Sequence, residues 1–334
     1  MRARNELSNA RIERRVAVHA LRTALTSMAC TPPCIIRSCP VAAFRRSCRC
    51  GRQLVRRSRI VGGRDAYDGE FPWIVSLRIN GQHECGGTII GKRWILTAAH
   101  CLQRATLRNL RVRVGEYHLY QAESGHSSLD LAPEKLLLHP LFGQPKRLSN
   151  DIGLLRLASD IPLGAFAVPA CLPSASDRSL YASGKNGTVA GWGYVRELRL
   201  GEHPALLALV RAGIPTTAAA DSFKDESLSA YMTDVLQKVE VQLMSNGQCN
   251  GLYIEAKKSI RVAREQLCAG HKEGKKDACT GDSGGPLMVL ADNTYVVIGV
   301  VSGGIGCARP LLPGLYTRIT SYMPWIMSHL RSSR

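Results

Sequence analysis

The sequence has no long hydrophobic run. Its longest uncharged apolar stretch, Tyr295–Cys307, covers 13 residues and includes four glycines. Since a helix that crosses a bilayer needs about 20 predominantly apolar residues, we expect no membrane span. A clear secretory leader is missing as well, because His19 and Arg22 interrupt Val16–Ala29, the stretch closest to the apolar core of a signal peptide.

Closely spaced cysteine pairs, which are typical of zinc sites, are missing from the body of the chain. The wide, irregular separations there favour disulfides, and disulfides favour an oxidising, extracellular compartment. The body cysteines are Cys85, Cys101, Cys171, Cys249, Cys268, Cys279 and Cys307, and the N-terminal cysteines are Cys30, Cys34, Cys39, Cys48 and Cys50. Because the body holds an odd number, complete pairing there requires one bond to the N-terminal segment.

Acidic residues are nearly absent from the N-terminal segment. The chain of 334 residues has a net charge of +18, and residues 1–59 carry 14 arginines against only Glu6 and Glu13. Such asymmetry is typical either of a nucleic-acid-binding arm or of an arginine-rich leader or propeptide. No aromatic residues alternate with these arginines and no nucleic-acid-binding motif accompanies them. We therefore interpret the segment as a propeptide and expect no nucleic-acid partner.

Long amphipathic helices are also scarce after Phe71. Short segments rich in β-branched residues, several of them alternating apolar and polar, indicate a β-sandwich or barrel. These segments are Trp73–Ile79, Thr88–Ala98, Leu110–Leu119 and Val296–Ser302. A hydrophobic content of 45% is enough for a sizeable core. One late helix is predicted at Tyr322–Leu330, with Trp325, Ile326 and Leu330 on one face.

The stretch Leu198–Met232 interrupts this pattern. It is rich first in Ala and Leu and then in Ser, Asp, Glu and Lys, between the strand-like AGWGYV and VLQKVEVQLM. Structureless loops longer than about 12–15 residues are uncommon in compact domains. We interpret it as a surface excursion outside the core, either a retained intron or a genuine long loop.

Three local motifs together indicate nucleophilic catalysis. TAAHC contains His100, NDIGLL contains Asp151, and GDSGGP contains Ser283. A serine hydroxyl needs an adjacent base, a histidine can take and return its proton, and a buried aspartate can hold the imidazole in the useful tautomer. Each motif alone is weak, because such residues most often lie in ordinary surface, turn or loop positions. Their joint occurrence is the specific signal.

Glycines surround this serine at Gly281, Gly284 and Gly285. Without a Cβ they let the backbone approach a substrate closely. Free N–H groups there can then face the negative charge that develops on a carbonyl oxygen during acyl transfer.

The segments IVGG at Ile60, TAAHC, NDIGLL, AGWG, GDSGGP and PGLYTRI together resemble the trypsin/chymotrypsin family of serine endopeptidases. VRVGEYHLY and QLCAG are most similar to arthropod trypsin-like and Stubble-like members. The resemblance implies an all-β fold of two six-stranded antiparallel β-barrels with a C-terminal helix, preceded by a basic, cysteine-containing propeptide. The implied division is a propeptide over 1–59 and a peptidase domain over 60–334, with barrels at about 60–175 and 176–330 and an insertion at 198–232.

The resemblance also implies site residues. His100, Asp151 and Ser283 would form the catalytic triad, and the backbone N–H groups of Gly281 and Ser283 the oxyanion hole. Substrate-binding residues would be Asp277, Ser302, Gly304 and Gly314. No cofactor is implied.

Primary specificity would depend on Asp277, six residues before Ser283. A carboxylate at the base of the pocket would select Arg through a bidentate pair and Lys through a water. The alternative is that Asp277 pairs with Lys275 or Lys276 on the surface.

Activation of a zymogen is implied as well. The cut would fall between Arg59 and Ile60, and the new Ile60 ammonium would pair with Asp282 to form the oxyanion loop. The implied disulfides are Cys85–Cys101, Cys249–Cys268, Cys279–Cys307 and Cys50–Cys171. Cys30, Cys34, Cys39 and Cys48 receive no assignment.

Two departures from the family pattern affect binding. Gly303 stands where the family has a tryptophan, so we expect weaker binding of substrate residues upstream of the cut. In the segment that matches the calcium loop of trypsin, Glu116 and Glu123 are suitably placed, but His126 replaces an acid. We therefore expect no calcium and no other metal.

The resulting interpretation is a secreted, monomeric, trypsin-like serine endopeptidase made as a zymogen. Its expected partners are protein or peptide substrates, an activating protease and protein inhibitors. One alternative is a catalytically dead homologue that acts as a binding module or cascade cofactor, although such homologues usually lose a triad residue. Another is a nucleic-acid binder that relies on residues 1–59.

Overall fold

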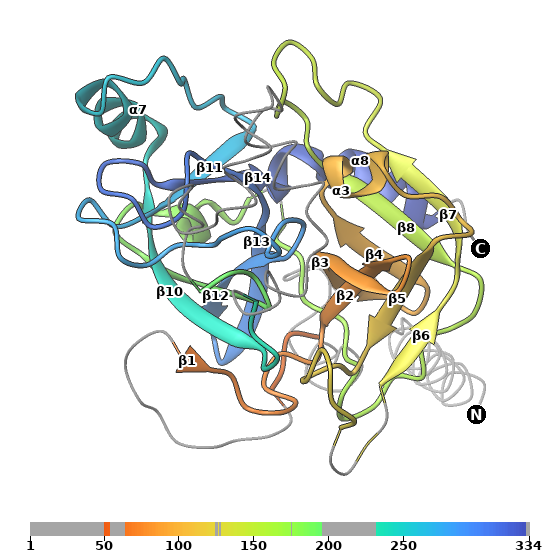
Figure 1. Cartoon of the computed structure of the whole chain (residues 1–334). Coiled ribbons are helices and arrows are strands. Elements are labelled where there is room, and N and C mark those ends of the chain that lie inside the picture. Colours follow the sequence, from red (N-terminus) through yellow and green to blue (C-terminus); the bar gives the residue numbers. More distant parts are fainter. Residues whose placement is uncertain are drawn as a thin grey trace, which may run out of the picture.

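The computed structural model describes residues 50–53, 64–123, 126, 128–174, 176–195 and 232–331. Two antiparallel sheets lie side by side, each curved as a barrel, and the chain completes most of one before it forms the other (Figure 1). The expected all-β fold of two barrels with a C-terminal helix is thereby confirmed. Arg59, Ile60 and residues 198–231 of the expected insertion lie outside the described ranges.

The first sheet has the strand order β6-β5-β2-β3-β4-β8-β7. Its strands are β2 (Ile74–Ile79), β3 (Gln82–Gly91), β4 (Trp94–Thr97), β5 (Leu110–Val114), β6 (Leu129–Leu131), β7 (Pro133–Leu138) and β8 (Gly153–Leu157). In β5 the apolar side chains of Leu110, Val112 and Val114 alternate with arginines and are buried. This period of two gives the strand one face in the core and one toward solvent.

The count of seven strands, instead of the expected six, follows from a break at Pro133. Proline has no N–H to donate to a neighbouring strand. The segment Leu129–Leu138 therefore divides into β6, which pairs with β5, and β7, which pairs with β8. Because β5 and β8 lie far apart in the strand order, this one segment closes the barrel.

The second sheet has the order β1-β10-β11-β14-β13-β12-β9, and β9 also pairs with β10. Its strands are β1 (Arg64–Asp65), β9 (Asn186–Gly191), β10 (Gln237–Met244), β11 (Gln266–Gly270), β12 (Pro286–Ala291), β13 (Thr294–Gly303) and β14 (Gly314–Arg318). The β9–β10 pairing closes this barrel with six strands. The seventh, the two-residue β1, joins the outer edge of β10.

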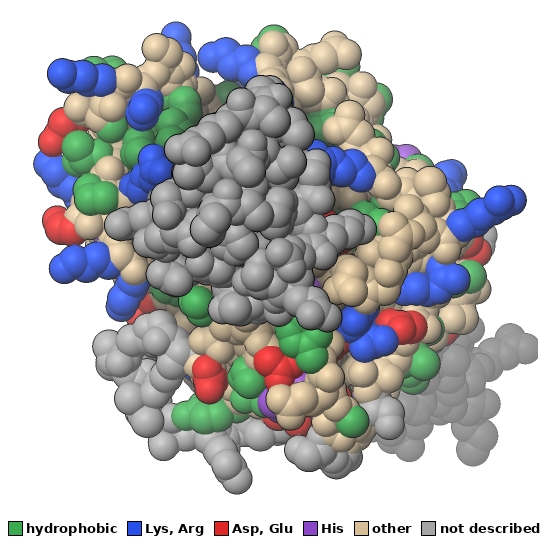
Figure 2. Space-filling view, viewed as in Figure 1, with side chains coloured by type: hydrophobic (Ala, Val, Ile, Leu, Met, Phe, Trp, Pro, Cys, Tyr) green, Lys and Arg blue, Asp and Glu red, His purple; other side chains and the backbone are tan. Residues whose placement is uncertain are grey.

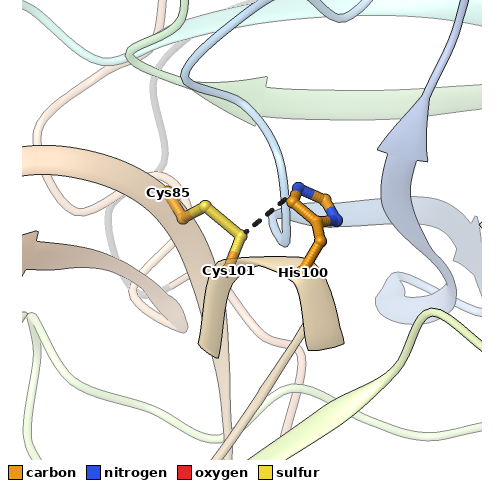
Figure 3. Close-up of side chains that lie close together, drawn as sticks. All are labelled: Cys85, His100 and Cys101. Atoms are coloured by element: carbon orange, nitrogen blue, oxygen red, sulfur yellow. Dashed lines mark hydrogen bonds between the residues drawn. A yellow bond between two sulfur atoms is a disulfide. The ribbon is translucent and has the colours of Figure 1, made fainter. Parts of the chain in front are cut away.

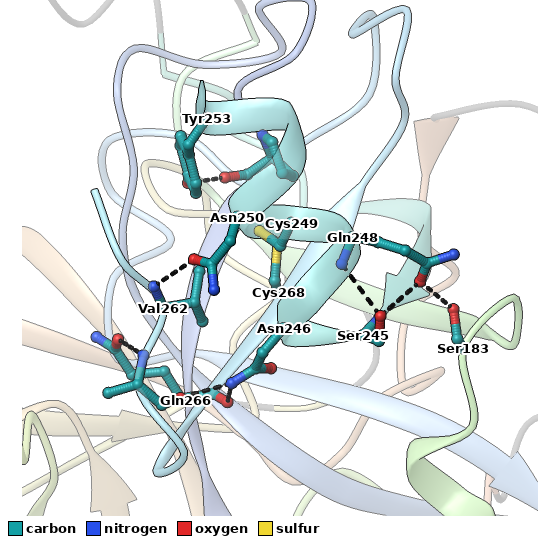
Figure 4. Close-up of a disulfide and its surroundings, with 12 residues drawn as sticks. Ser183, Ser245, Asn246, Gln248, Cys249, Asn250, Tyr253, Val262, Gln266 and Cys268 are labelled. Atoms are coloured by element: carbon teal, nitrogen blue, oxygen red, sulfur yellow. Dashed lines mark hydrogen bonds between the residues drawn. A yellow bond between two sulfur atoms is a disulfide. The ribbon is translucent and has the colours of Figure 1, made fainter. Parts of the chain in front are cut away.

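Within the described ranges helices are few: α3 (Ala99–Gln103), the 3₁₀ helix η1 (Arg178–Tyr181), α7 (Asn246–Glu255) and α8 (Ile319–Arg331). Ser245 begins α7 with a capping box, its hydroxyl accepting from the Gln248 N–H (Figure 4). The Cys249–Cys268 disulfide then joins α7 to β11. Helix α8 is longer than the predicted helix, and its buried residues are Ile319, Tyr322, Met323 and Ile326. The expected Trp325 and Leu330 pack against the core only partly buried.

The hydrophobic core is continuous between the barrels. Trp73, fully buried in the first barrel, directs its indole N–H to the Met288 sulfur in β12 at 2.9 Å. Its ring also packs against Phe71 and Tyr295. This shared core holds the two barrels at one relative position, which a site built from both requires.

Residues 50–53 are attached to the barrels. Cys50 bonds Cys171, Gly51 donates to the Pro169 carbonyl, and the Gly51 carbonyl accepts from the Tyr295 N–H. Gly51 has φ +59°, and a Cβ there would overlap the Tyr295 carbonyl oxygen. Only glycine suits this position, because it tolerates the left-handed conformation and the close approach.

The expected insertion leaves and re-enters the second barrel at neighbouring points. Tyr194, just before it, forms an antiparallel bridge with Met232, its last residue. Met232 also packs against the hydrophobic core. At its last residue the expected surface excursion thus contacts the core, and its other residues lie outside the described ranges.

None of the helices within the described ranges has both the length and the apolar content needed to cross a membrane. On the face seen in Figure 2, lysine and arginine side chains are distributed over both barrels.

Candidate active site

His100 is held at the start of the short helix α3, directly after β4. Its backbone N–H donates to Asp151 Oδ1 at 3.0 Å, and its ring Nδ1–H donates to Oδ2 at 2.7 Å. Because a carboxylate only accepts, Nδ1 must carry the proton and Nε2 is left with a lone pair. The histidine is thus oriented as a base.

Asp151 lies two residues before β8 and its side chain has no solvent exposure. Besides the two bonds from His100, Oδ2 accepts from the Ser302 hydroxyl at 2.6 Å. The Asp151 carbonyl accepts from the Thr317 hydroxyl, also at 2.6 Å. Ser302 and Thr317 belong to the second barrel, so both barrels position this carboxylate.

Ser283 lies in the tight turn between Asp282 and Gly285, just before β12. Its carbonyl accepts from the Gly86 N–H at 2.8 Å. Gly86 follows Cys85, whose disulfide to Cys101 lies beside the His100 ring (Figure 3). This chain of contacts brings the serine turn to the histidine helix.

The serine turn fits closely against the first barrel. Gly284 has φ +78°, and a Cβ there would overlap the Thr97 hydroxyl, three residues before His100. A larger residue at 284 would push Ser283 away from the histidine.

No hydrogen bond joins Ser283 Oγ to His100 among the described residues, and His100 Nε2 lies 3.7 Å from Cys101 Sγ. Catalytic hydrogen bonds are often long without substrate and tighten when it binds. Within the described residues, the backbone N–H groups of Gly281 and Ser283 donate to no protein group. They are therefore available to an incoming oxygen.

A residue that the sequence motifs do not identify is His83. It is buried, its Nε2 lies 3.0 Å from the Gly281 carbonyl, and its Nδ1 lies 2.8 Å from Ser76 Oγ. Burial lowers the pKa of His83 to about 4, so the neutral ring donates to Gly281 and accepts from Ser76. It thereby orients the Gly281 peptide. Its position two residues before Cys85 is the signal that could have drawn attention to it.

Two buried carboxylates line one cavity of about 400 Å³. Asp282 accepts from the N–H groups of Gly193 and Cys279, both at 2.9 Å. Asp277 accepts from Ala278 N–H at 2.9 Å and Ala308 N–H at 3.3 Å. Burial raises the pKa of Asp282 to about 6 and that of Asp277 to about 7. Neither forms a salt bridge within the described residues, including the neighbouring Lys275 and Lys276.

The other expected substrate-binding residues occupy different surroundings. Ser302 directs its hydroxyl to Asp151, so only its backbone remains for substrate. A Cβ at Gly314 would lie 2.7 Å from Asp277 Oδ1, so a side chain there would displace the carboxylate. Gly304 has more room, since the nearest atom to a Cβ would be the Gly306 carbonyl oxygen at 3.6 Å.

Gly303, which stands where the family has a tryptophan, lies close to an apolar side chain. A Cβ added at Gly303 would lie 2.9 Å from Leu148 Cδ1. Leu148 comes from the loop that precedes Asp151. A side chain at position 303 would therefore require Leu148 to move.

The described structure contains four disulfides, with the same pairings that the resemblance implies: Cys50–Cys171, Cys85–Cys101, Cys249–Cys268 and Cys279–Cys307. Cys30, Cys34, Cys39 and Cys48 lie outside the described residues. The Cys85–Cys101 bond also means that His100 has no thiolates beside it with which to bind a metal.

The calcium-loop glutamates do not share one site. Glu116 is buried and pairs with Arg78 at 2.9 Å and with Arg113 at 3.3 Å. These two guanidinium groups supply the positive charge that a bound metal ion would otherwise supply at Glu116. Glu123 instead lies near Asp68 and His126.

Comparisons with known proteins agree with this architecture. The family described as Trypsin matches residues 60–221 and 204–326. The Drosophila melanogaster protein "Serine proteinase stubble" is 32% identical over 298 residues, which cover 87% of this chain and 33% of that protein. "Transmembrane protease serine 9" of Rattus norvegicus is 35% identical, over 89% of this chain and 25% of that protein. "Ovochymase-2" of Mus musculus is 33% identical, over 85% of this chain and 44% of that protein.

The chain thus spans between a quarter and less than half of the length of these relatives. The family match, in contrast, covers most of the chain and includes both barrels and the motifs around His100, Asp151 and Ser283. The chain belongs to the trypsin family of serine proteases.

Proposed function

We propose that this protein is a serine endopeptidase that cleaves peptide bonds after Arg or Lys through an acyl-enzyme on Ser283. The observation that carries the proposal is the buried Asp151 carboxylate, which orients His100 through two hydrogen bonds next to the turn that holds Ser283. Lysine or arginine specificity and zymogen activation are further parts of the same proposal.

In the proposed reaction, Ser283 Oγ attacks the carbonyl carbon while His100 Nε2 takes its proton. The carbonyl oxygen becomes negative and accepts from the N–H groups of Gly281 and Ser283. Loss of one such donor typically costs about 3–4 kcal/mol of transition-state stabilisation. His100 then protonates the leaving amine, the C–N bond breaks, and a water hydrolyses the ester by the same steps.

Asp151 stabilises the imidazolium and holds its orientation without taking the proton itself. The Ser302 hydroxyl supports this role, because it donates to the same oxygen as His100 Nδ1. His83 contributes indirectly, since its hydrogen bond to the Gly281 carbonyl helps to fix the backbone conformation of Gly281, whose own N–H is proposed to face the oxyanion.

Asp277 is proposed to select the residue before the cut. Its carboxylate is largely buried, accepts two backbone N–H groups and forms no salt bridge within the described residues. An arginine side chain would supply that cation and pair with both oxygens. The alternative pairing with Lys275 or Lys276 receives no support, because neither forms a salt bridge with Asp277.

Asp282 is proposed to receive the ammonium group of Ile60 after cleavage at Arg59. The cavity that it lines has room for an entering chain end. Lys238, Lys275 and Lys276 also line this cavity, but none of the described residues forms a salt bridge with the Asp282 carboxylate. Cys50 would keep the propeptide attached through Cys171 after the cut. The activating protease, protein inhibitors, extracellular location and monomeric state belong to the same proposal.

A fluorophosphonate probe tests the proposed chemistry. After treatment of the purified chain with a trypsin-like activator, we expect covalent labelling of Ser283, located by peptide mass mapping, and none in Ser283→Ala. A catalytically dead homologue would remain unlabelled while still binding a protein partner. That result would overturn the proposed endopeptidase activity.

A further inference from the structure

Three metal-ligating side chains converge outside the proposed active site. Asp68 lies between β1 and β2, whereas Glu123 and His126 belong to the long loop between β5 and β6. One potential ligand atom of each lies within 4.8 Å of those of the other two. Residues far apart in the sequence thus present oxygen and nitrogen ligands to one point.

His126 is held in the tautomer that a metal ligand requires. Its Nε2–H donates to the Gly115 carbonyl at 2.8 Å, so Nδ1 carries the lone pair. The ring is stacked on Phe166 at 3.6 Å and its side chain is only 10% exposed. Metal-binding histidines almost always direct their other ring N–H to a carbonyl or carboxylate in this way.

The Nδ1 lone pair faces acceptors instead of donors. Nδ1 is buried without a hydrogen-bond partner, and the closest charged atom is Asp68 Oδ2 at 3.6 Å. Glu123 accepts from the N–H groups of Tyr117 and His118 with Oε1 only, and its Oε2 is also buried and unpartnered. Two buried acceptors without a donor, His126 Nδ1 and Glu123 Oε2, beside the Asp68 carboxylate require a cation or a proton between them.

Nearby cationic side chains do not fill this role. Arg78 and Arg113 pair with Glu116, and Lys238 pairs with Glu70. His118 is also near, but its Nδ1 lies 3.1 Å from Asp234. Burial, together with the negative charge of Glu123, raises the pKa of Asp68 in the absence of a metal.

We propose that Asp68, Glu123 and His126 bind one divalent transition-metal ion of the Zn²⁺ class through Oδ2, Oε2 and Nδ1, with water as a fourth ligand. Bonds of about 2.0 Å in a tetrahedral site place ligand atoms about 3.3 Å apart. The Asp68–His126 separation of 3.6 Å is close to this value. A histidine nitrogen suits Zn²⁺, whereas Ca²⁺ prefers 6–8 oxygen ligands.

The ion would join the segment after β1 to the loop between β5 and β6. Of the two glutamates in the segment that matches the calcium loop, it would use Glu123 but not Glu116, which pairs with Arg78 and Arg113. Such a bond across the edge of the barrels would stabilise the folded chain by mass action, because the unfolded chain does not hold the three ligands together. The sequence-based expectation of no metal would then be wrong.

Calorimetric titration with ZnCl₂ tests this site. We expect the full-length Ser283→Ala chain, dialysed against a chelator, to bind one Zn²⁺ and to melt at higher temperature when loaded. In His126→Gln the affinity should fall by more than the roughly 10–100-fold typical of losing an outer-shell partner. Asp68→Asn, at a partly exposed position, should have the same effect if His126→Gln does not fold.

His271→Gln is the matched control, since His271 is exposed and bonds only the Glu240 carbonyl. It should leave zinc binding unchanged. If zinc instead binds at His100, its affinity in His126→Gln and in Asp68→Asn would equal that of the parent Ser283→Ala chain. That result would overturn the proposal. So would the absence of zinc binding, which would mean that a proton on His126 joins it to Asp68.

Discussion

At the scale of single residues, the carboxylates Asp277 and Asp282 are the clearest sign of function. Each is buried in the same cavity, and each has a raised pKa because burial disfavours its charge. A protein rarely keeps a buried charge without a partner. The proposed endopeptidase supplies two cations, a substrate side chain for Asp277 and a chain terminus for Asp282.

Asp277→Ser should abolish the preference for Arg and Lys. Truncating one partner of a buried charge pair typically costs about 2–5 kcal/mol. We therefore expect kcat/KM for an arginine peptide to fall by at least about 30-fold in the activated enzyme. Lys276→Gln is the control and should change little. Retained arginine preference in Asp277→Ser, or a wild-type preference for Phe or Leu, would mean that Asp277 does not contact substrate.

His83 should make the protein sensitive to acid. The pKa of His83 is about 4 in the folded chain against an ordinary value near 6.5. The stabilising contribution is therefore fully present above pH 6.5 and is lost as the pH falls through 4. By linkage the loss amounts to about 3 kcal/mol.

Denaturant unfolding of Ser283→Ala with and without His83→Gln measures this contribution. Raised pKa values at Asp277 and Asp282 act in the opposite direction, so only the difference between the two proteins is informative. That difference in unfolding free energy should shrink between pH 7 and pH 3.5. Parallel pH profiles would show that His83 is not held neutral.

At the scale of elements, local sequence explains most boundaries. Pro133 divides one segment into β6 and β7, and Ser245 with Gln248 begins α7. The ends of the expected insertion are set differently, by the pairing of Tyr194 with Met232. This bridge brings Tyr194 and Met232 side by side.

Deletion of residues 198–231 should preserve folding and cleavage of small peptides. Shortening a loop whose ends are already adjacent reduces the entropic cost of closing it. We expect an unchanged or slightly higher melting temperature and similar kcat/KM on a small arginine peptide. Deletion of 198–232 is the control and should be less stable, because it also removes the packing of Met232. Failure of the shorter deletion to fold would place the segment in the core.

At the scale of the whole molecule, the site exists only where the barrels meet. His100 and Asp151 come from the first barrel, and Ser283 and Ser302 from the second. The continuous core around Trp73 and the bond from Gly86 to Ser283 keep them together. Residues 50–53, attached through Cys50 and Cys171, add a third segment to this assembly.

Arg59→Gln should block activation. Without the cut, Ile60 has no free ammonium group to pair with Asp282, and an unpaired buried partner typically costs about 3–5 kcal/mol. We expect the variant to remain a single chain and at least 100-fold less active after treatment with a trypsin-like activator. The cut wild type should separate into two chains only after reduction, because Cys50 bonds Cys171. Full activity in the uncut variant would contradict the scheme.

Local patterns in the sequence were sufficient for much of this description. Alternating β-branched segments predicted strands, and the motifs around His100, Asp151 and Ser283 predicted the chemistry, because each signal lies within a few consecutive residues. The buried face of α8 was predicted less well, since Trp325 and Leu330 are only partly buried. Periodicity indicates that a helix has an apolar face, but neighbouring elements determine how deeply each residue on it is buried.

Other features depend on contacts between distant segments. His83 is recognisable only once Ser76 and Gly281 lie on either side of its ring, and the cluster of Asp68, Glu123 and His126 forms only when two loops meet. Their sequence signals are weak: His83 lies two residues before Cys85, and Glu123 and His126 lie in the segment that matches the calcium loop. Motifs and periodicity determine strands and local chemistry because they depend on adjacent residues. The burial of a charge, the tautomer of a histidine and the convergence of ligands depend on folding, because only folding removes water and brings remote atoms within bonding distance.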